Sequence, residues 1–436
     1  MKLAVVVQRY GSDIGAGSEL HARYVAERLS AHAEVTVLTT CARDHVSWRN
    51  EYPAGADQVN GVPVERFPVA RERDLKAFAR LSRLVFDERH SLADELRWLD
   101  SEGPVCPRLT ARVRQAGDEF DFVLIFTIRY HCAYHAARAA GRRAVLVPTA
   151  ERDPALGLAL FGPVFRGVRA VMYNTPEEQA LITALTSNAD VPGVVVGIGS
   201  DVPTAAAPDI ARQRFGLTAP FMLYVGRIDP NKGCAELFDY FTQYLHASDR
   251  SIDLVLVGRP TMPIPQHPRI RHLGYVTDEE KFSVIAAADL VVVPSYYESL
   301  SMAALEAWAL GRPVLANGRC DVLAGQCLRS NAGLAYTSSA EFIGMADRVL
   351  DDAPLAAAMG ASGRRYYAEH YSWPVIERAY LDMFSRLAGE PPAHSMAPLP
   401  HWFARRARTL PPATAVLRDA PSGPVRAAAP SRYAVS

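Results

Sequence analysis

Cysteine is scarce and scattered in this sequence. Only six of the 436 residues are cysteine, and none of them forms a Cys-x-x-Cys pair. They are Cys41, Cys106, Cys132, Cys234, Cys320 and Cys327. Small disulfide-bonded domains and zinc modules both depend on closely spaced cysteines, so the sequence excludes a disulfide framework and a cysteine zinc site. A reducing cytosol is therefore the expected environment.

An excess of charge of either sign is also missing. The 47 lysines and arginines balance 47 aspartates and glutamates, for a formal net charge of zero. A neutral chain has no global field that would attract nucleic acid or an anionic membrane. We expect no nucleic-acid partner, and any such attraction has to be local.

Long hydrophobic runs are absent as well. No window approaches the run of about 18 apolar residues that a membrane span needs. The opening segment MKLAVVVQRY is too short for the core of a secretory signal, and we interpret it as a first buried strand. The expected location is cytoplasmic, with peripheral contact at the inner face of the membrane left open.

What the sequence does contain is a steady alternation of two patterns. With 49% hydrophobic and 22% charged residues, the chain has the composition of a folded protein long enough for two domains. Short apolar runs alternate with segments of helical period, which is typical of parallel strands joined by crossover helices. The predicted strands are Leu3–Val7, Glu34–Leu38, Phe122–Phe126, Ala144–Val147, Ala170–Tyr173, Gly193–Val196, Phe221–Val225, Leu254–Val257, Ile270–Leu273, Leu290–Val293 and Val314–Leu315. The predicted helices are Glu19–Leu29, His131–Ala140, Pro176–Leu185, Ala235–Leu245, Glu279–Ala287 and Ser301–Leu310. The predicted fold class is α/β.

Composition also marks the domain boundaries. Glycine, proline and small residues over 197–208 break both patterns and predict a linker between a first domain, 1–196, and a second, 209–370. From residue 390 the chain is rich in proline, alanine and arginine, so we expect a disordered tail over 390–436. Within it, His401–Leu410 mixes aromatic residues with arginines, which fits either a solvated tail or a weak contact with a membrane surface.

The most informative segment is VVVPSYYESLSMAALEAWALGRPVLA, residues 291–316. A buried strand runs into a loop and then into a helix that Ser299 or Ser301 caps. Glu298 stands in the loop and Glu306 about two turns into the helix. Free N–H groups at a helix N-terminus favour a diphosphate, and flanking carboxylates can accept hydrogen bonds from sugar and ribose hydroxyls. Taken alone, two such acids are also compatible with a solvated helix.

In context this segment resembles the hallmark of glycosyltransferase family 4. Relatives carry a glycine-rich GFGL after the first glutamate, where this chain has Ser299, Leu300, Ser301 and Met302. The resemblance implies a GT-B fold, in which two Rossmann-like doubly wound domains face each other across a cleft. It implies that these four residues and Glu306 bind the donor and that Glu298 takes part in catalysis. Segment 371–389 resembles the family's closing helix, which returns to the first domain.

The segment LYVGRIDPNKG, residues 223–233, is the second element. Arg227 and Lys232 follow a strand, and two cations that converge on a diphosphate would stabilise the leaving group without a metal. The family places its pyrophosphate-binding arginine and lysine in this GRxxxxKG pattern, and Gly226 belongs to the same donor-binding loop. The alternative is that both cations are merely solvated.

Two further segments complete the predicted donor side. Gly15 and Gly17 lie in a first loop that reads GAGxxL, which is a poor match to a dinucleotide fingerprint. The resemblance implies that this loop approaches the donor phosphates, and a plain tight turn is the alternative. Tyr275 and Val276 lie in a segment similar to the one that lines the family's base pocket.

The acceptor side resembles the family less closely. Relatives often have a histidine in a PTAHDE-like run, where this chain reads PTAERD and has Glu151. Glu151 and Arg129 are the candidates for contacting the acceptor. The alternative for Glu151 is an ordinary surface glutamate.

Two features lie outside the resemblance. His131 and His135 stand four residues apart on a predicted helix and could bind a metal ion, but no third ligand is evident, so we expect an ordinary helix-face pair and no metal. The charge-rich insertion, about 71–118, places Arg71, Arg73, Lys76, Arg80 and Arg83 near Leu75, Phe78 and Leu81. It predicts either a solvated helix or a contact with an anionic lipid carrier.

Together these observations predict a retaining glycosyltransferase that needs no metal or other cofactor. It would move a sugar from a UDP or GDP sugar to a hydroxyl of a glycan or lipid-linked acceptor, in bacterial surface polysaccharide or glycolipid assembly. A sugar-nucleotide 2-epimerase and a non-catalytic nucleotide-sugar-binding protein are the alternatives. The sequence identifies neither the sugar nor the acceptor.

Overall fold

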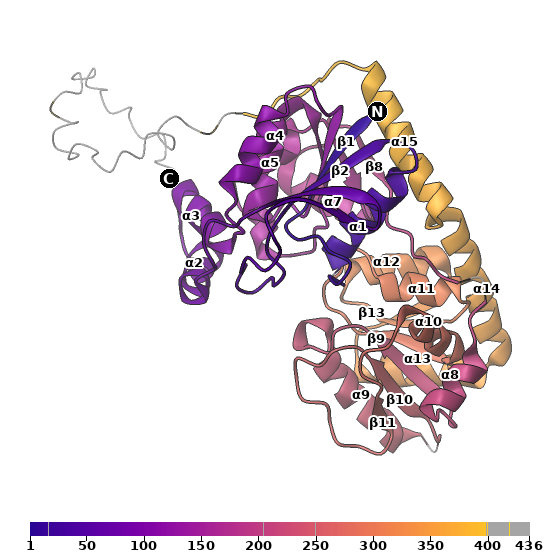
Figure 1. Cartoon of the computed structure of the whole chain (residues 1–436). Coiled ribbons are helices and arrows are strands. Elements are labelled where there is room, and N and C mark those ends of the chain that lie inside the picture. The colour runs from indigo at the N-terminus through magenta and orange to yellow at the C-terminus, as the bar shows by residue number, and fades with distance from the viewer. Residues whose placement is uncertain (16, 204, 249, 398, 400–417, 419–436) are drawn as a thin grey trace, which may run out of the picture. The chain divides into compact units, whose positions relative to one another are not determined.

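A computed structural model describes residues 1–15, 17–203, 205–248, 250–397, 399 and 418 of the chain. Met1–Met396 forms one compact unit, which holds two parallel sheets with their helices (Figure 1). Most of the expected disordered tail, including His401–Leu410, lies outside the described residues. Within the described part, no helix combines the length and the apolar character needed to cross a membrane.

The first sheet has eight strands in the order β3-β4-β2-β1-β5-β6-β7-β8. Every neighbouring pair is parallel except β3 and β4. The strands are β1 Lys2–Val6, β2 Glu34–Thr40, β3 Gly55–Val59, β4 Val62–Phe67, β5 Phe122–Phe126, β6 Ala144–Val147, β7 Ala170–Tyr173 and β8 Gly193–Val195. Strands β1, β5 and β6 are buried almost throughout, as expected of a parallel sheet covered on both faces.

Seven α-helices accompany this sheet. They are α1 Gly17–Leu29, α2 Leu75–Asp87, α3 Leu92–Glu102, α4 Pro107–Gln115, α5 His131–Ala140, α6 Gly162–Gly167 and α7 Pro176–Thr186, with 3-10 turns at Gly141–Arg143 and Pro154–Gly157. The 71–118 insertion is therefore folded as α2, α3 and α4, and it packs on the domain through apolar side chains such as Trp98 and Leu109.

The second sheet is parallel throughout, in the order β11-β10-β9-β12-β13-β14. Its strands are β9 Phe221–Val225, β10 Asp253–Val257, β11 Ile270–His272, β12 Leu290–Val293, β13 Val314–Asn317 and β14 Gly333–Tyr336. Its helices are α8 Pro208–Phe215, α9 Cys234–Ala247, α10 Asp278–Ala287, α11 Met302–Ala309, α12 Asp321–Ser330, α13 Ser339–Asp351 and α14 Ala353–His370, with a 3-10 turn at Pro230–Lys232. The α/β prediction is confirmed.

Helix α15, Trp373–Gly389, lies against the first domain although it follows the second in sequence (Figure 1). Phe384 stacks on Phe122 of β5, with ring centroids 5.2 Å apart, and Trp373 meets Tyr24 of α1 edge-on. Between the two sheets, the described residues of 197–203 and 205–207 form no helix or strand.

The sequence analysis missed several elements. The hairpin β3–β4 turns at Asn60 and Gly61, which both have positive φ, so the Asn-Gly dipeptide was an available signal. Strand β14 and helices α12, α13 and α14 were also missed. Where both agree on an element, its ends differ by at most two residues, as at β13, which runs on to Asn317 rather than ending at Leu315.

Candidate functional site

The second sheet has a reversal of strand order between β9 and β12. These two strands are neighbours in the sheet although β10 and β11 separate them in sequence. In open parallel sheets, ligands bind outside the carboxyl ends of the strands at such a switch point. The loop after β9 carries Arg227 and Lys232, and the loop after β12 carries Glu298. The topology therefore brings the predicted catalytic residues to one place.

A glycine allows these two loops to touch. Gly233 has φ +72°, and a Cβ atom there would lie 2.0 Å from the carbonyl oxygen of Pro294. Any other residue would force the loop after β9 away from the end of β12. Gly233, the last residue of the GRxxxxKG pattern, is thus needed for the backbone of this loop to approach the end of β12.

Lys232 and Glu298 form an ion pair across this contact, with 2.7 Å between Nζ and Oε1. Burial lowers the pKa of the Lys232 ammonium, but the Glu298 carboxylate raises it, and the result lies above the ordinary value. Lys232 is therefore a cation at neutral pH. Arg227 pairs with Asp229, whose carboxylate also accepts a hydrogen bond from the Lys232 backbone N–H at 3.0 Å.

Glu306 is buried inside the second domain, with 5% of its surface exposed. Its Oε1 accepts hydrogen bonds from Ser200 Oγ at 2.9 Å and from Lys281 Nζ at 3.0 Å. Ser200 belongs to the segment between the sheets and Lys281 to α10. The sequence analysis missed both partners, because neither stands at a recognisable spacing from Glu306.

The four residues that replace the glycine-rich run surround the start of α11. Ser301 caps the helix by accepting a hydrogen bond from the Ala304 N–H at 3.3 Å, and Met302 is the first helical residue. Leu300 is buried. Ser299 Oγ accepts a hydrogen bond at 3.4 Å from Asn174, which follows β7 of the first sheet. This run therefore joins the two domains as well as starting the helix.

The remaining donor-side candidates lie in two other loops. Tyr275 is 79% exposed with the Arg259 guanidinium over its ring, whereas Val276 is buried. Gly15 and Gly17 stand at the start of α1, where a Cβ atom would meet nothing within 4 Å. A buried Arg9–Glu19 pair at 2.6 Å supports this first loop and was not predicted.

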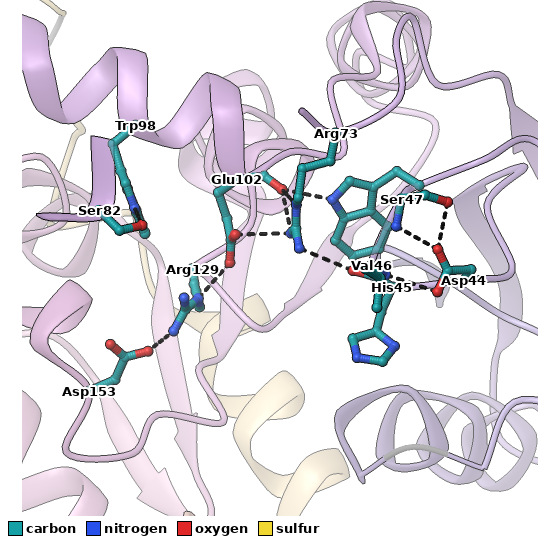
Figure 2. Close-up of polar contacts among 11 residues, drawn as sticks. Asp44, His45, Val46, Ser47, Arg73, Ser82, Trp98, Glu102, Arg129 and Asp153 are labelled. Atoms are coloured by element: carbon teal, nitrogen blue, oxygen red, sulfur yellow. Dashed lines mark hydrogen bonds and ion pairs between the residues drawn. The ribbon is translucent and has the colours of Figure 1, made fainter. Parts of the chain in front are cut away.

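On the acceptor side, Arg129 belongs to an ion-pair network rather than standing free (Figure 2). Its Nε donates to Glu102 Oε1 at 2.7 Å, and it also contacts Asp153. The same Glu102 pairs with Arg73 at 2.9 Å. The Arg129 guanidinium is therefore already paired with two carboxylates, those of Glu102 and Asp153.

Glu151 lies close enough to the predicted donor-binding residues for their charges to shift its pKa. Burial raises its pKa, the Glu298 carboxylate raises it further, and Lys232, Arg129 and Arg227 act against this. Glu151 lines a small cavity with Glu298 and Tyr297. Glu178, which the sequence analysis did not single out, lines it too and accepts 2.5 Å hydrogen bonds from the N–H groups of Ala150 and Asn174. Burial raises the pKa of Glu178 to about 8.

The two histidines of α5 have a third group beside them after all. Asp100 of α3 lies next to His131 and His135, and it is a candidate third ligand that was not evident from the sequence. A contact between two helices so distant in sequence leaves no trace in local spacing.

Comparison with known proteins finds a family model that matches the second domain. Residues 219–352 match the family model described as "Glycosyl transferases group 1". The D-inositol 3-phosphate glycosyltransferase of Corynebacterium diphtheriae is 28% identical over 227 residues, which is 47% of this chain and 52% of that protein. The chain thus spans about half the length of the first curated relatives that it matches.

Solved structures resemble nearly the whole described fold. The HepE protein of Anabaena, in complex with UDP-glucose, aligns over 88% of this chain and 100% of its own with a TM-score of 0.63 and 18% identity. Sucrose-phosphate synthase of Thermosynechococcus elongatus aligns over 89% and 99% with a TM-score of 0.61 and 17% identity. The GT-B fold prediction is confirmed.

Proposed function

We propose that this chain, whose residues 219–352 form a glycosyl transferases group 1 domain in a GT-B fold, transfers a sugar from a nucleotide-diphosphate sugar to an acceptor hydroxyl. The observation that carries the proposal is the Lys232–Glu298 pair at the switch point of the second sheet, in front of helix α11. A cation, a carboxylate and a helix N-terminus there provide partners for a diphosphate and for sugar hydroxyls.

In the proposed reaction, the donor diphosphate takes the place of Glu298 beside Lys232. Lys232 and Arg227 then neutralise the negative charge that grows on the diphosphate as the glycosidic bond breaks. The released Glu298 carboxylate accepts hydrogen bonds from the sugar, and Glu306 accepts them from the ribose. Lys232 is positioned for this role because its charge is already maintained by the partly buried Glu298 carboxylate.

We further propose retention of anomeric configuration, by attack of the acceptor on the face that the diphosphate leaves, with the diphosphate oxygen taking the acceptor proton. This route needs neither a metal ion nor a protein nucleophile. Glu151 would contact the acceptor, since it lines the same cavity as Glu298 from the side of the first domain.

For the donor, a UDP sugar is the first candidate, because the HepE structure contains UDP-glucose. For the acceptor, we propose a glycan or a lipid-linked intermediate of surface polysaccharide or glycolipid assembly, reached by a cytoplasmic enzyme at the membrane surface. The support is α2, which exposes Leu75 beside Lys76, Arg80 and Arg83.

A donor panel with matched lysine variants tests the proposal. Melting temperatures measured with UDP, GDP and ADP sugars should rise for one base class. With that donor and a panel of glycan and lipid acceptors, Lys232→Ala should lower the transfer rate by about 10²–10³. Lys2→Ala, which removes an exposed lysine that pairs with Glu34 away from the candidate site, should leave the rate unchanged.

Product analysis by NMR separates the rival outcomes. An α-linked product from an α-linked donor would support retention. A changed sugar configuration on the nucleotide, formed without any acceptor, would indicate an epimerase. Wild-type rates for Lys232→Ala would contradict the proposed role of the pair, and donor binding without turnover on any acceptor would contradict the transfer proposal.

A further inference from the structure

Two histidines and an aspartate of the first domain lie close to one another. His131 and His135 are one helical turn apart at the start of α5, and Asp100 stands near the end of α3. One ligand atom from each residue lies within 4.8 Å of the other two. The group belongs to a different domain from Lys232 and Glu298, and the proposed transfer reaction does not use it.

The spacing within this group fits a shared cation. His131 Nε2 and Asp100 Oδ1 are 3.3 Å apart. Around a tetrahedral zinc ion with bonds of about 2.0–2.1 Å, neighbouring ligand atoms stand roughly 3.3–3.4 Å apart. The two imidazole rings lie close together, with centroids separated by 4.2 Å. Only small side-chain adjustments would place all three ligand atoms around one ion.

The residue types also suit a metal. Two imidazole nitrogens and a carboxylate oxygen are ligands that zinc accepts.

Contacts within the protein account for only one of the two nitrogens of the His131 ring. His131 is only 7% exposed, and its Nδ1 has no hydrogen-bond partner among the described residues. Asp100 contacts the Nε2 atom of the ring, so Nδ1 lacks a hydrogen-bond partner whichever nitrogen carries the proton. Arg71 on the Asp100 side, and Arg138 and Arg114 on the His135 side, are the other charges that act on the group, and they oppose a bound cation.

An ion could reach the group from solvent. Asp100 is the exposed member, with 53% of its side chain accessible, and it also lines a cavity of about 330 Å³ together with Trp48 and Arg73. Three protein ligands leave a fourth position of a tetrahedral site open. That position would be filled by water or by a molecule in the cavity.

We propose that Asp100, His131 and His135 bind one divalent transition-metal ion, with zinc the first candidate from the nitrogen and oxygen ligand set. The bound ion ties the end of α3 to the start of α5 and thereby fixes the inserted α2–α3 segment on the first domain.

Metal titration of the full chain tests this. After removal of metal with a chelator, Zn²⁺ binding is measured by calorimetry and Co²⁺ binding by its visible absorption. We expect one ion per chain, a tetrahedral Co²⁺ spectrum and a melting temperature that rises with Zn²⁺. Asp100→Asn and His135→Gln should each weaken binding at least about tenfold. His246→Gln, which changes an exposed histidine of α9, should bind as the wild type does.

Two results would overturn the proposal. One is the absence of binding to the wild-type chain. The other is equal affinity in Asp100→Asn and His246→Gln, which would identify an adventitious ion only. Asp100 is exposed, so its variant retains the fold and carries the test even if His135→Gln does not. Because the readout is metal binding, its failure is distinguishable from failure of the proposed transfer.

Discussion

His21 illustrates at the residue scale how burial controls a charge in this protein. It lies on α1 with 3% of its surface exposed, and its ring meets Phe126 edge-on at 5.2 Å. Burial lowers its pKa from the ordinary 6.5 to about 3. Between pH 6.5 and about 3, His21 is therefore neutral in the folded state but protonated in an unfolded chain.

This difference predicts a specific acid sensitivity. Between pH 6.5 and 3 the unfolded state binds a proton that the folded state does not, so stability is fully present above pH 6.5 and is lost as pH falls toward 3. His21 contributes up to about 1.4 kcal/mol per pH unit to that slope. His21→Leu should flatten the dependence of the unfolding free energy on pH, measured by urea denaturation. The exposed His246→Gln serves as the control, and equal slopes for the two variants would contradict the argument.

Lys281 shows what a single side chain adds to the candidate site. It holds Glu306 inside the second domain, and Ser200 holds the same carboxylate oxygen from the segment between the sheets. Burial lowers the pKa of Lys281, but Glu306 and then Asp278 raise it above the ordinary value. A buried carboxylate is tolerated here because a cation accompanies it. The position of Glu306 is thus set by two residues from other parts of the chain.

At the scale of elements, the geometry of the site depends on the loop between β9 and α9. Gly233 has a positive φ and lies against the carbonyl of Pro294 at the end of β12. The two loops that hold Lys232 and Glu298 can approach only because this residue has no side chain. The backbone of Gly233 and Pro294 therefore determines how close the two loops come, and the charged side chains do not.

Two glycine variants distinguish the cost of a left-handed backbone from the cost of a steric clash with Pro294. Gly274 has nearly the same φ as Gly233, +76° against +72°, but a Cβ atom there would meet nothing within 4 Å. Gly274→Ala should cost about 1–2 kcal/mol of stability from the left-handed backbone alone. Gly233→Ala should cost more and should also separate Lys232 from Glu298. Unfolding free energies from urea denaturation measure both, and equal losses would show that the collision with Pro294 is relieved without cost.

At the scale of the whole molecule, the chain returns to the first domain after completing the second. Helix α15 covers part of the first sheet through Phe384, which is almost fully buried against Phe122. Arg169 at the start of β7 strengthens this attachment by donating to the carbonyls of Leu387 and Pro391. The first domain is therefore complete only when residues near position 390 have been added.

Truncating Phe384 should destabilise the first domain although the residue lies far from it in sequence. Phe384→Ala removes a buried ring and should lower the unfolding free energy by about 3–5 kcal/mol. Arg386→Ala, on an exposed position of the same helix, should change it by less than about 0.5 kcal/mol. Thermal unfolding followed by circular dichroism compares the two, and a small loss for Phe384→Ala would mean that α15 does not complete this core.

Local pattern determined the architecture. Runs such as Phe122–Phe126 and Leu290–Val293 are continuously apolar, which is characteristic of strands buried on both faces, and their bounds agree with the structure. The helix start at Ser301 and the positions of Lys232 and Glu298 after two strands also followed from local signals. Parallel strands place their carboxyl ends at one edge, so these local signals were enough to predict that Lys232 and Glu298 lie close together.

Tertiary structure alone decided which side chains meet. The Glu306–Lys281 pair, the Arg129–Glu102 pair and the Asp100–His131 contact each join segments without any fixed spacing in sequence. Their distances depend on how helices and loops pack after the sheets have formed, and periodicity carries no information about that packing. The sequence by itself thus determined most strands of the two sheets, and the cation and acid that follow β9 and β12 in the second sheet. Only the tertiary structure decided which side chains bury and orient those residues, because helices and loops pack after the strands have paired.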